Sequence, residues 1–216
     1  MFPFLRLASE QAPPPEIERA RRLALLRTRV AKEMHDRGWS RLAVLPLTVG
    51  AGATTVALEL TWALLRQQGV RVTLVDLNFL EPSIARQLEL DGCSPVTDQI
   101  KSGADLDALL VELPEQPGLR VLAPAAPEPY PAELLQSPSF ARALAAMLER
   151  QGSDYVIMDL SALLGSDVGM SALPLAESIL MVADGMSTKP ADMKLAERYL
   201  ADEAPLMGVV LNKAEK

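Results

Sequence analysis

Short apolar runs alternate along this chain with longer segments of helical periodicity. The apolar runs cover residues 42–47, 70–76, 119–122, 155–159, 178–183 and 207–211. The helical segments cover residues 54–68, 82–88, 106–113, 139–151, 169–175 and 190–201. Strands that are apolar throughout and separated by helices are typical of a parallel sheet covered on both faces. We therefore expect an α/β fold with a doubly wound, mostly parallel sheet.

The part of the chain before this alternation divides into two segments. Residues 1–15 end in a run of prolines, and we expect a flexible N-terminal segment there. Residues 16–38 have apolar side chains at helical spacing and end at Gly38, which favours a helix that stops at this glycine. We expect this helix to serve in oligomerisation and residues 39–216 to form one domain. One side of the helix is basic, with Arg19, Arg21, Arg22, Arg27, Arg29 and Lys32.

Charge and composition exclude several classes of protein. The 216 residues suffice for one sizeable domain, and the net charge of −7 argues against binding to nucleic acid. No apolar run approaches the roughly 20 residues that span a bilayer. Cys93 is the single cysteine, so we expect no disulfide framework and no metal cluster. These properties indicate a cytoplasmic protein without a membrane span.

The first strand is followed by a glycine-containing turn that opens a long helix. Residues 47–55 have the sequence Leu-Thr-Val-Gly-Ala-Gly-Ala-Thr-Thr. Gly50 and Gly52 allow backbone N–H groups to face a phosphate, and Thr54 and Thr55 place hydroxyl groups at the start of the helix, where a P-loop binds Mg²⁺. This arrangement favours a phosphate-binding loop. The alternative is a tight strand-to-helix connection without a ligand, which a Gly-x-Gly turn often forms.

The same turn lacks two residues of the full P-loop motif. Leu47 stands at the position of the first glycine, and Ala53 stands at the position of the lysine that contacts the β- and γ-phosphates. A hydrogen bond to a charged group contributes about 1.5–3 kcal/mol. Loss of the lysine is therefore expected to weaken nucleotide binding about tenfold to a hundredfold. Ala53 keeps its place among the candidate phosphate contacts, because its backbone N–H group is still present.

Three later apolar runs end in a polar side chain, namely Asp76, Asp159 and Asn212. Because the carboxyl ends of parallel strands meet at one edge of a sheet, we expect these side chains to lie beside the glycine turn. An Asp at the end of a strand also often caps a turn or a helix, and Asn212 can cap its own strand. A purely structural role therefore stays open for each of the three.

The order of these segments, from residue 42 to residue 212, resembles the MinD/ParA group of deviant-Walker P-loop ATPases. Residues 122–137, Leu-Ala-Pro-Ala-Ala-Pro-Glu-Pro-Tyr-Pro-Ala-Glu-Leu-Leu-Gln-Ser, are more closely similar to the bacterial tyrosine kinases that work with polysaccharide chain-length regulators. Those kinases have a turn of small residues and prolines after a strand, and then a Pro-x-Glu-Leu-Leu-x-Ser helix start. The resemblance implies a MinD-like P-loop NTPase fold for residues 39–216.

The resemblance also implies a role for each candidate residue in binding ATP or ADP with Mg²⁺. Thr54 would bind Mg²⁺, and Thr55 would contact the α-phosphate. Asp76 would activate the attacking group or hold metal-bound water, which makes it the candidate catalytic residue. Asp159 would bind Mg²⁺ through water, and Asn212 would contact the adenine.

Departures from the kinase pattern argue against chemistry at this site. Thr48 stands where MinD/ParA proteins have a second, signature lysine, so both loop lysines are missing. Phosphoryl transfer depends on positioned positive charge. The kinases phosphorylate a tyrosine cluster at their C-terminus, whereas the tyrosines of this chain are scattered. We expect nucleotide binding that is weak or absent, and no strong autokinase activity. The tyrosines are Tyr130, Tyr155 and Tyr199.

A tyrosine-kinase-like protein with such a loop would act as a regulatory or scaffolding subunit in exopolysaccharide or capsule biosynthesis and export. Its partner would be a membrane chain-length regulator (a polysaccharide copolymerase) or a sister kinase, in a homo- or hetero-oligomer at the inner face of the membrane. One alternative is an active tyrosine autokinase or ATPase of the same pathway, whose missing cation comes from Arg41 or from a neighbouring subunit's basic helix. The other is a spatial-positioning ATPase of the MinD/ParA type, which the absent signature lysine disfavours.

Overall fold

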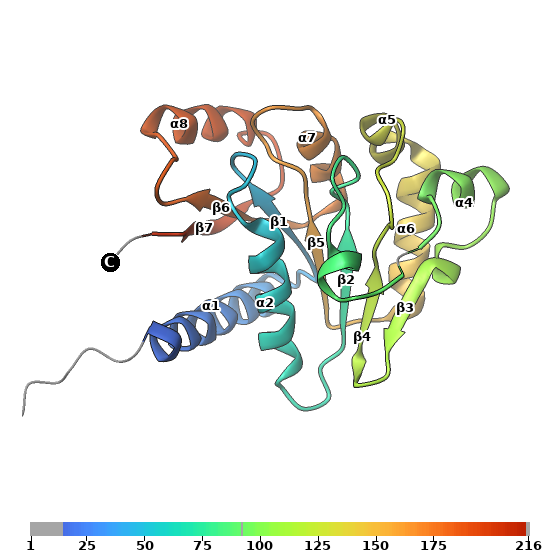
Figure 1. Ribbon diagram of the computed structural model, residues 1–216, viewed down its shortest axis with the longest axis horizontal. Coiled ribbons are helices and arrows are strands. Elements are labelled where there is room, and N and C mark those ends of the chain that lie inside the picture. Colours follow the sequence, from blue (N-terminus) through green and yellow to red (C-terminus); the bar gives the residue numbers. More distant parts are fainter. Residues whose placement is uncertain (1–14, 92, 215–216) are drawn as a thin grey trace, which may run out of the picture.

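A single seven-stranded sheet organises the computed structural model, which describes residues 15–91 and 93–214 (Figure 1). The strand order is β3-β4-β2-β5-β1-β6-β7, and every neighbouring pair is parallel except β3 with β4. The doubly wound, mostly parallel sheet predicted from the sequence is confirmed. The strands are β1 (Arg41–Pro46), β2 (Val72–Asp76), β3 (Leu110–Leu113), β4 (Gln116–Leu122), β5 (Tyr155–Asp159), β6 (Ser178–Asp184) and β7 (Leu206–Asn212).

Helices cover both faces of this sheet, because the central strands bury side chains on both sides. In β1, Leu42 and Val44 pack toward α1, α2 and α3, whereas Ala43 and Leu45 pack toward the helices of the other face. Figure 1 shows these two layers on either side of the strands. The helices are α1 (Pro15–Arg37), α2 (Ala53–Leu65), α3 (Ile84–Gln87), α4 (Val96–Ser102), α5 (Pro131–Gln136), α6 (Pro138–Gln151), α7 (Val168–Ala172) and α8 (Pro190–Tyr199), with the 3₁₀ helices η1 (Leu106–Leu109) and η2 (Leu173–Leu175).

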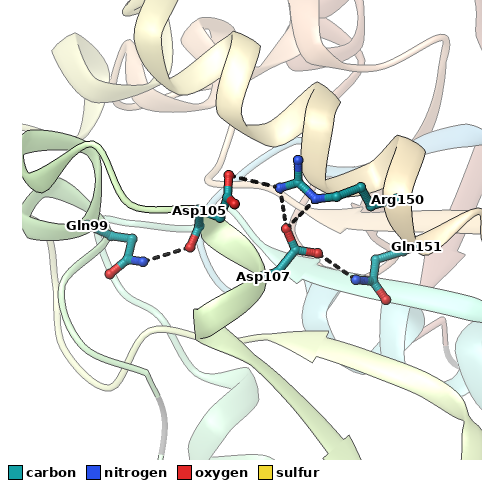
Figure 2. Close-up of polar contacts among 5 residues, drawn as sticks. All are labelled: Gln99, Asp105, Asp107, Arg150 and Gln151. Carbon is teal, nitrogen blue, oxygen red and sulfur yellow. Dashed lines mark hydrogen bonds and ion pairs between the residues drawn. The ribbon is translucent and has the colours of Figure 1, made fainter.

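The prediction of a helix over residues 106–113 is wrong. These residues form η1 followed by β3, which pairs antiparallel with β4 at the edge of the sheet. A short apolar run has no periodicity that separates a strand from a buried helical turn, and the pairing with β4 decides between them here. Figure 2 shows how η1 is held against α6: Asp107 accepts hydrogen bonds from Arg150 Nε at 2.8 Å and from Gln151 Nε2 at 2.7 Å.

The sequence predicts no helix or strand over residues 96–102, where the structure has α4. The start of α4 is capped by Glu128, which comes from a distant part of the chain and is 4% exposed. Its Oε1 accepts from the backbone N–H of Val96 at 2.5 Å, and its Oε2 accepts from the Thr97 hydroxyl at 2.6 Å. A buried carboxylate therefore connects α4 to the loop that follows β4.

The predicted N-terminal helix is present as α1, which ends at Arg37 just before Gly38 (φ 69°). Val30 and Met34 are buried in the same core cluster as α2. The basic side is partly neutralised, because three of its members have carboxylate partners within the chain: Arg19 pairs with Glu59, Arg22 with Glu18, and Lys32 with Asp36. Oligomerisation through α1 stays a prediction. The segment predicted for residues 1–15 lies, apart from Pro15, outside the described residues.

Candidate functional site

The three strands that were predicted to carry the site are adjacent at the centre of the sheet. β5 lies between β1 and β2, and Asp76 and Asp159 are register partners at the carboxyl ends of their strands. A cavity of about 730 Å³ opens at this edge. It is lined by residues 49–55 of the glycine turn, by residues 78, 80–83, 86 and 87 after β2, by residues 160–162, 165 and 166 after β5, and by Pro46, Pro127 and Lys213.

The glycine turn has the geometry of an anion-binding loop. Gly50 and Gly52 have φ angles of 79° and 86°, in a backbone region that residues other than glycine rarely adopt. The first hydrogen bond of α2 runs from the Val56 N–H to the Gly52 carbonyl at 3.2 Å. The N–H groups of residues 53–55 therefore have no partner within the helix and lie at the positive end of its dipole, as at known phosphate sites.

The position of the P-loop lysine has no charge in the structure. Ala53 is 4% exposed and belongs to the core cluster beside α2. Leu47, at the position of the first glycine, is fully buried in the cluster on the other face of the sheet. Thr48 forms a parallel bridge with Leu164. None of these three positions supplies a cation, in agreement with the expectation that the loop itself is uncharged.

Asp76, the candidate catalytic residue, is fully buried and holds the segment after β2. Its Oδ1 accepts from the N–H of Asn78, and its Oδ2 accepts from the N–H groups of Ser83 and Ile84, each at 3.0 Å. Burial raises the pKa of Asp76 to about 6, although the three backbone donors act to lower it. Neither Asp76 nor Asp159 is among the residues that line the cavity, and the contacts of Asp76 match a capping role, which the sequence leaves open.

Asp159 differs from Asp76 because its carboxylate has no hydrogen-bond partner in the described part of the chain. The side chain is fully buried, and neither oxygen has a hydrogen bond among the described residues. Burial, and after it the negative charge of Asp76, raises the pKa of Asp159 well above its ordinary value. The Thr54 hydroxyl is near enough to lower this pKa in part, but it makes no hydrogen bond of normal geometry.

These residues fit the predicted Mg²⁺ site. Mg²⁺ prefers oxygen ligands, and in nucleotide sites it uses one or two carboxylates together with water and phosphate oxygens. Asp159 offers two unpaired oxygens beside the Thr54 hydroxyl, and Asp76 is the neighbouring carboxylate. Among the described residues no group of three or more His, Cys, Asp or Glu side chains forms a metal cluster. When bound, Mg²⁺ would supply charge to a polyphosphate, and these residues would hold the ion and its water.

Two residues at the carboxyl end of β7 contact the glycine turn directly. Asn212 Nδ2 donates to the Ala51 carbonyl at 2.9 Å, and Lys213 Nζ donates to the Gly50 carbonyl at 2.6 Å. The predicted contact of Asn212 with adenine stays a prediction. Lys213 was not predicted as a site residue, although its position directly after a strand-terminal asparagine could have indicated it.

The alternative prediction that Arg41 supplies the missing positive charge is wrong. Arg41 begins β1, at the edge of the sheet opposite the cavity, and it pairs with Glu177 at 3.0 Å.

Solved structures of other proteins share the fold of this chain. No family model and no curated protein sequence matches the chain. The solved kinase domain of VpsO has a TM-score of 0.78, with 22% identity, over 94% of this chain and 100% of its own. The kinase domain of Escherichia coli tyrosine kinase ETK has a TM-score of 0.79, with 18% identity, over 90% of this chain and 75% of its own. The chain has the fold of bacterial tyrosine kinase domains.

A more distant similarity supports the MinD-like assignment of this tyrosine-kinase fold. The septum site-determining protein MinD of Pyrococcus horikoshii, solved with Mg-ADP, has a TM-score of 0.64 and 19% identity over 80% of this chain and 69% of its own. These identities establish the fold alone.

The contact between Gly52 and Asn212 yields a testable prediction. A Cβ at Gly52 would lie 2.3 Å from Asn212 Nδ2, whereas a Cβ at Gly50 would have no atom within 4 Å. Both glycines have positive φ, so Gly50→Ala is expected to lower the free energy of unfolding by about 1 kcal/mol through the backbone alone. Gly52→Ala is expected to cost about 2 kcal/mol, because Asn212 must also leave Ala51. Urea denaturation of both variants measures the difference, and equal losses would contradict this contact.

Proposed function

We propose that this chain is a regulatory or scaffolding subunit, built on a tyrosine-kinase-like fold, in exopolysaccharide or capsule biosynthesis and export. It works by binding a partner, and its binding of nucleotide is weak or lost. The partner is a membrane chain-length regulator or a sister kinase. Among residues 15–91 and 93–214, no helix combines the length and the apolar character that crossing a bilayer requires. In this proposal the partner holds the chain at the inner face of the membrane.

The observation that carries this proposal is the charge of the loop. The frame of a phosphate site is retained in Gly50, Gly52 and Thr54, but a buried Ala53 stands at the lysine position. Asp76 is engaged by three backbone N–H groups. A site that keeps its backbone while it lacks the charge for phosphoryl transfer supports binding over catalysis.

The test compares partner binding with autophosphorylation. Tagged protein is expected to co-purify with the chain-length regulator from detergent-solubilised membranes, and purified protein with ATP and Mg²⁺ is expected to give no phosphotyrosine signal beside an active bacterial tyrosine kinase. Asp159→Asn is the site variant of choice, because it breaks no hydrogen bond. It is expected to retain the partner. Strong autophosphorylation that Asp159→Asn abolishes would show an active enzyme and overturn the proposal.

One observation favours the second candidate function, an active ATPase or autokinase of the same pathway. Lys213 lines the cavity and contacts the loop, so a cation is present within the chain itself. The same blot decides between the two functions. Both candidate functions include contacts between subunits through α1. Deletion of residues 1–37 is therefore expected to lower the oligomer mass measured by light scattering.

A further inference from the structure

Residues 212 and 213 hold the glycine turn from outside. They donate to two successive carbonyls of the turn, those of Ala51 and Gly50. Lys213 has a φ of 54°, which is uncommon for a residue other than glycine. Uncommon backbone conformations of this kind collect at ligand sites. The Gly50 and Ala51 carbonyls are thereby occupied, and the N–H groups of residues 53–55, which have no partner within α2, remain available to the cavity.

The ammonium group of Lys213 contacts the glycine turn through its hydrogen bond to the Gly50 carbonyl. Two cations line the cavity, Arg86 on α3 and Lys213, and of these Lys213 has the hydrogen bond to Gly50. Its side chain is 48% exposed, and its flexible four-carbon stem allows the ammonium group to move toward a ligand. An ammonium group has three donors, and Gly50 and Asp184 account for two of them.

We infer that Lys213 supplies the phosphate loop with positive charge for a nucleoside polyphosphate, in place of the lysine missing at position 53. This inference rests on the nucleotide site under Proposed function and commits it to weak binding rather than none. The cation reaches the loop from the end of the last strand instead of from the loop itself. ATP with Mg²⁺ still carries net negative charge, so a nearby ammonium group attracts it.

Asp184 makes the inference sharper, because it competes with a phosphate for the same cation. Its Oδ2 lies 3.3 Å from Lys213 Nζ, while its Oδ1 accepts from the N–H groups of Met186 and Ser187. Asp184→Asn keeps an acceptor for that turn and removes the competing charge. If Lys213 serves phosphate, the variant binds polyphosphate more tightly. If Lys213 only fastens the fold, the variant brings no gain.

Calorimetric titration of the full chain with ATP and Mg²⁺ tests this, with inorganic triphosphate as a second probe that has no base. Wild-type protein is expected to bind with a dissociation constant between about 0.1 and 5 mM. Lys213→Met is expected to weaken both probes about tenfold, Lys213→Arg to stay within about threefold of wild type, and Asp184→Asn to tighten both probes about threefold. Lys101→Met, at an exposed position on α4, is the control and should change nothing.

Three results would overturn the inference: wild-type protein that binds neither probe at about 10 mM, Lys213→Met that binds as wild type, or Asp184→Asn that gains no affinity. Far-UV circular dichroism confirms that each variant is folded. The proposed function fails on different measurements, namely autophosphorylation or the absence of a partner, and those leave the ratios of these affinities unchanged.

Discussion

Asp159→Asn is expected to raise the free energy of unfolding by about 2 kcal/mol near neutral pH. Most substitutions of fully buried residues destabilise a protein, but here the wild-type side chain is a buried carboxylate without a hydrogen-bond partner among the described residues. Asparagine has nearly the same shape and removes the charge. The gain follows because the site is strained by its own carboxylates, which a bound cation would relieve.

The pH dependence of stability distinguishes this explanation from a general packing effect. A carboxyl group with a raised native pKa takes up its proton on folding, so its contribution is complete below the unfolded pKa near 3.8 and is lost as pH rises through the native pKa, about 6 for Asp76. The whole shift corresponds to about 3 kcal/mol, most of which is lost between pH 4 and pH 7. We expect urea midpoints of wild type to fall over this range, and those of Asp159→Asn to fall less.

Asp202→Asn is the matched control, because Asp202 is exposed and distant in sequence from the site. It is expected to change the free energy of unfolding by no more than about 0.5 kcal/mol. A loss of stability in Asp159→Asn, or a pH profile parallel to that of wild type, would show that Asp159 has a partner or is not buried as described.

Glu128→Ala is expected to lower the free energy of unfolding by about 3 kcal/mol. The substitution leaves the Val96 N–H and the Thr97 hydroxyl without their acceptor and opens space next to a buried helix start. Glu128→Gln keeps one acceptor oxygen and should lose about half as much. Urea denaturation at constant pH measures all three proteins.

Glu133→Ala provides the control for the Glu128 substitutions. Glu133 is exposed in the first turn of α5, so its removal is expected to cost less than about 0.5 kcal/mol. If Glu128→Ala costs no more than this control, the cap of α4 does not contribute to stability. A localised loss, with faster hydrogen exchange in α4 alone, would instead show that α4 opens independently of the sheet.

Sequence reasoning located the central strands because strands buried on both faces must be apolar throughout. The run that became β5 could be recognised in this way, and so could Asp159 at its end. The edge strand β3 could not, because its burial is partial and its identity depends on pairing with β4. Local pattern carries information about burial, whereas the choice of partner strand is made by the tertiary structure.

The candidate site was predictable in position and only partly in role. Parallel strands bring their carboxyl ends together, so the proximity of Asp76 and Asp159 follows from the strand pattern. Their opposite environments do not, because the donors that hold Asp76 come from a turn whose path the sequence leaves open. Lys213 was missed for a related reason: its hydrogen bond to the Gly50 carbonyl joins positions 163 residues apart, and the sequence does not show which distant groups a side chain will contact.

The hydrogen bonds from residues 212 and 213 to the glycine turn can form only after β7 has been synthesised. The two partners are 161 and 163 positions apart along the chain, so the turn leaves the ribosome long before the residues that hold it. Contacts between such distant positions form late in folding. The cavity is therefore completed by β7, which is translated after the other six strands of the sheet, and a chain that stops before β7 would contain every predicted loop residue and still lack a finished site.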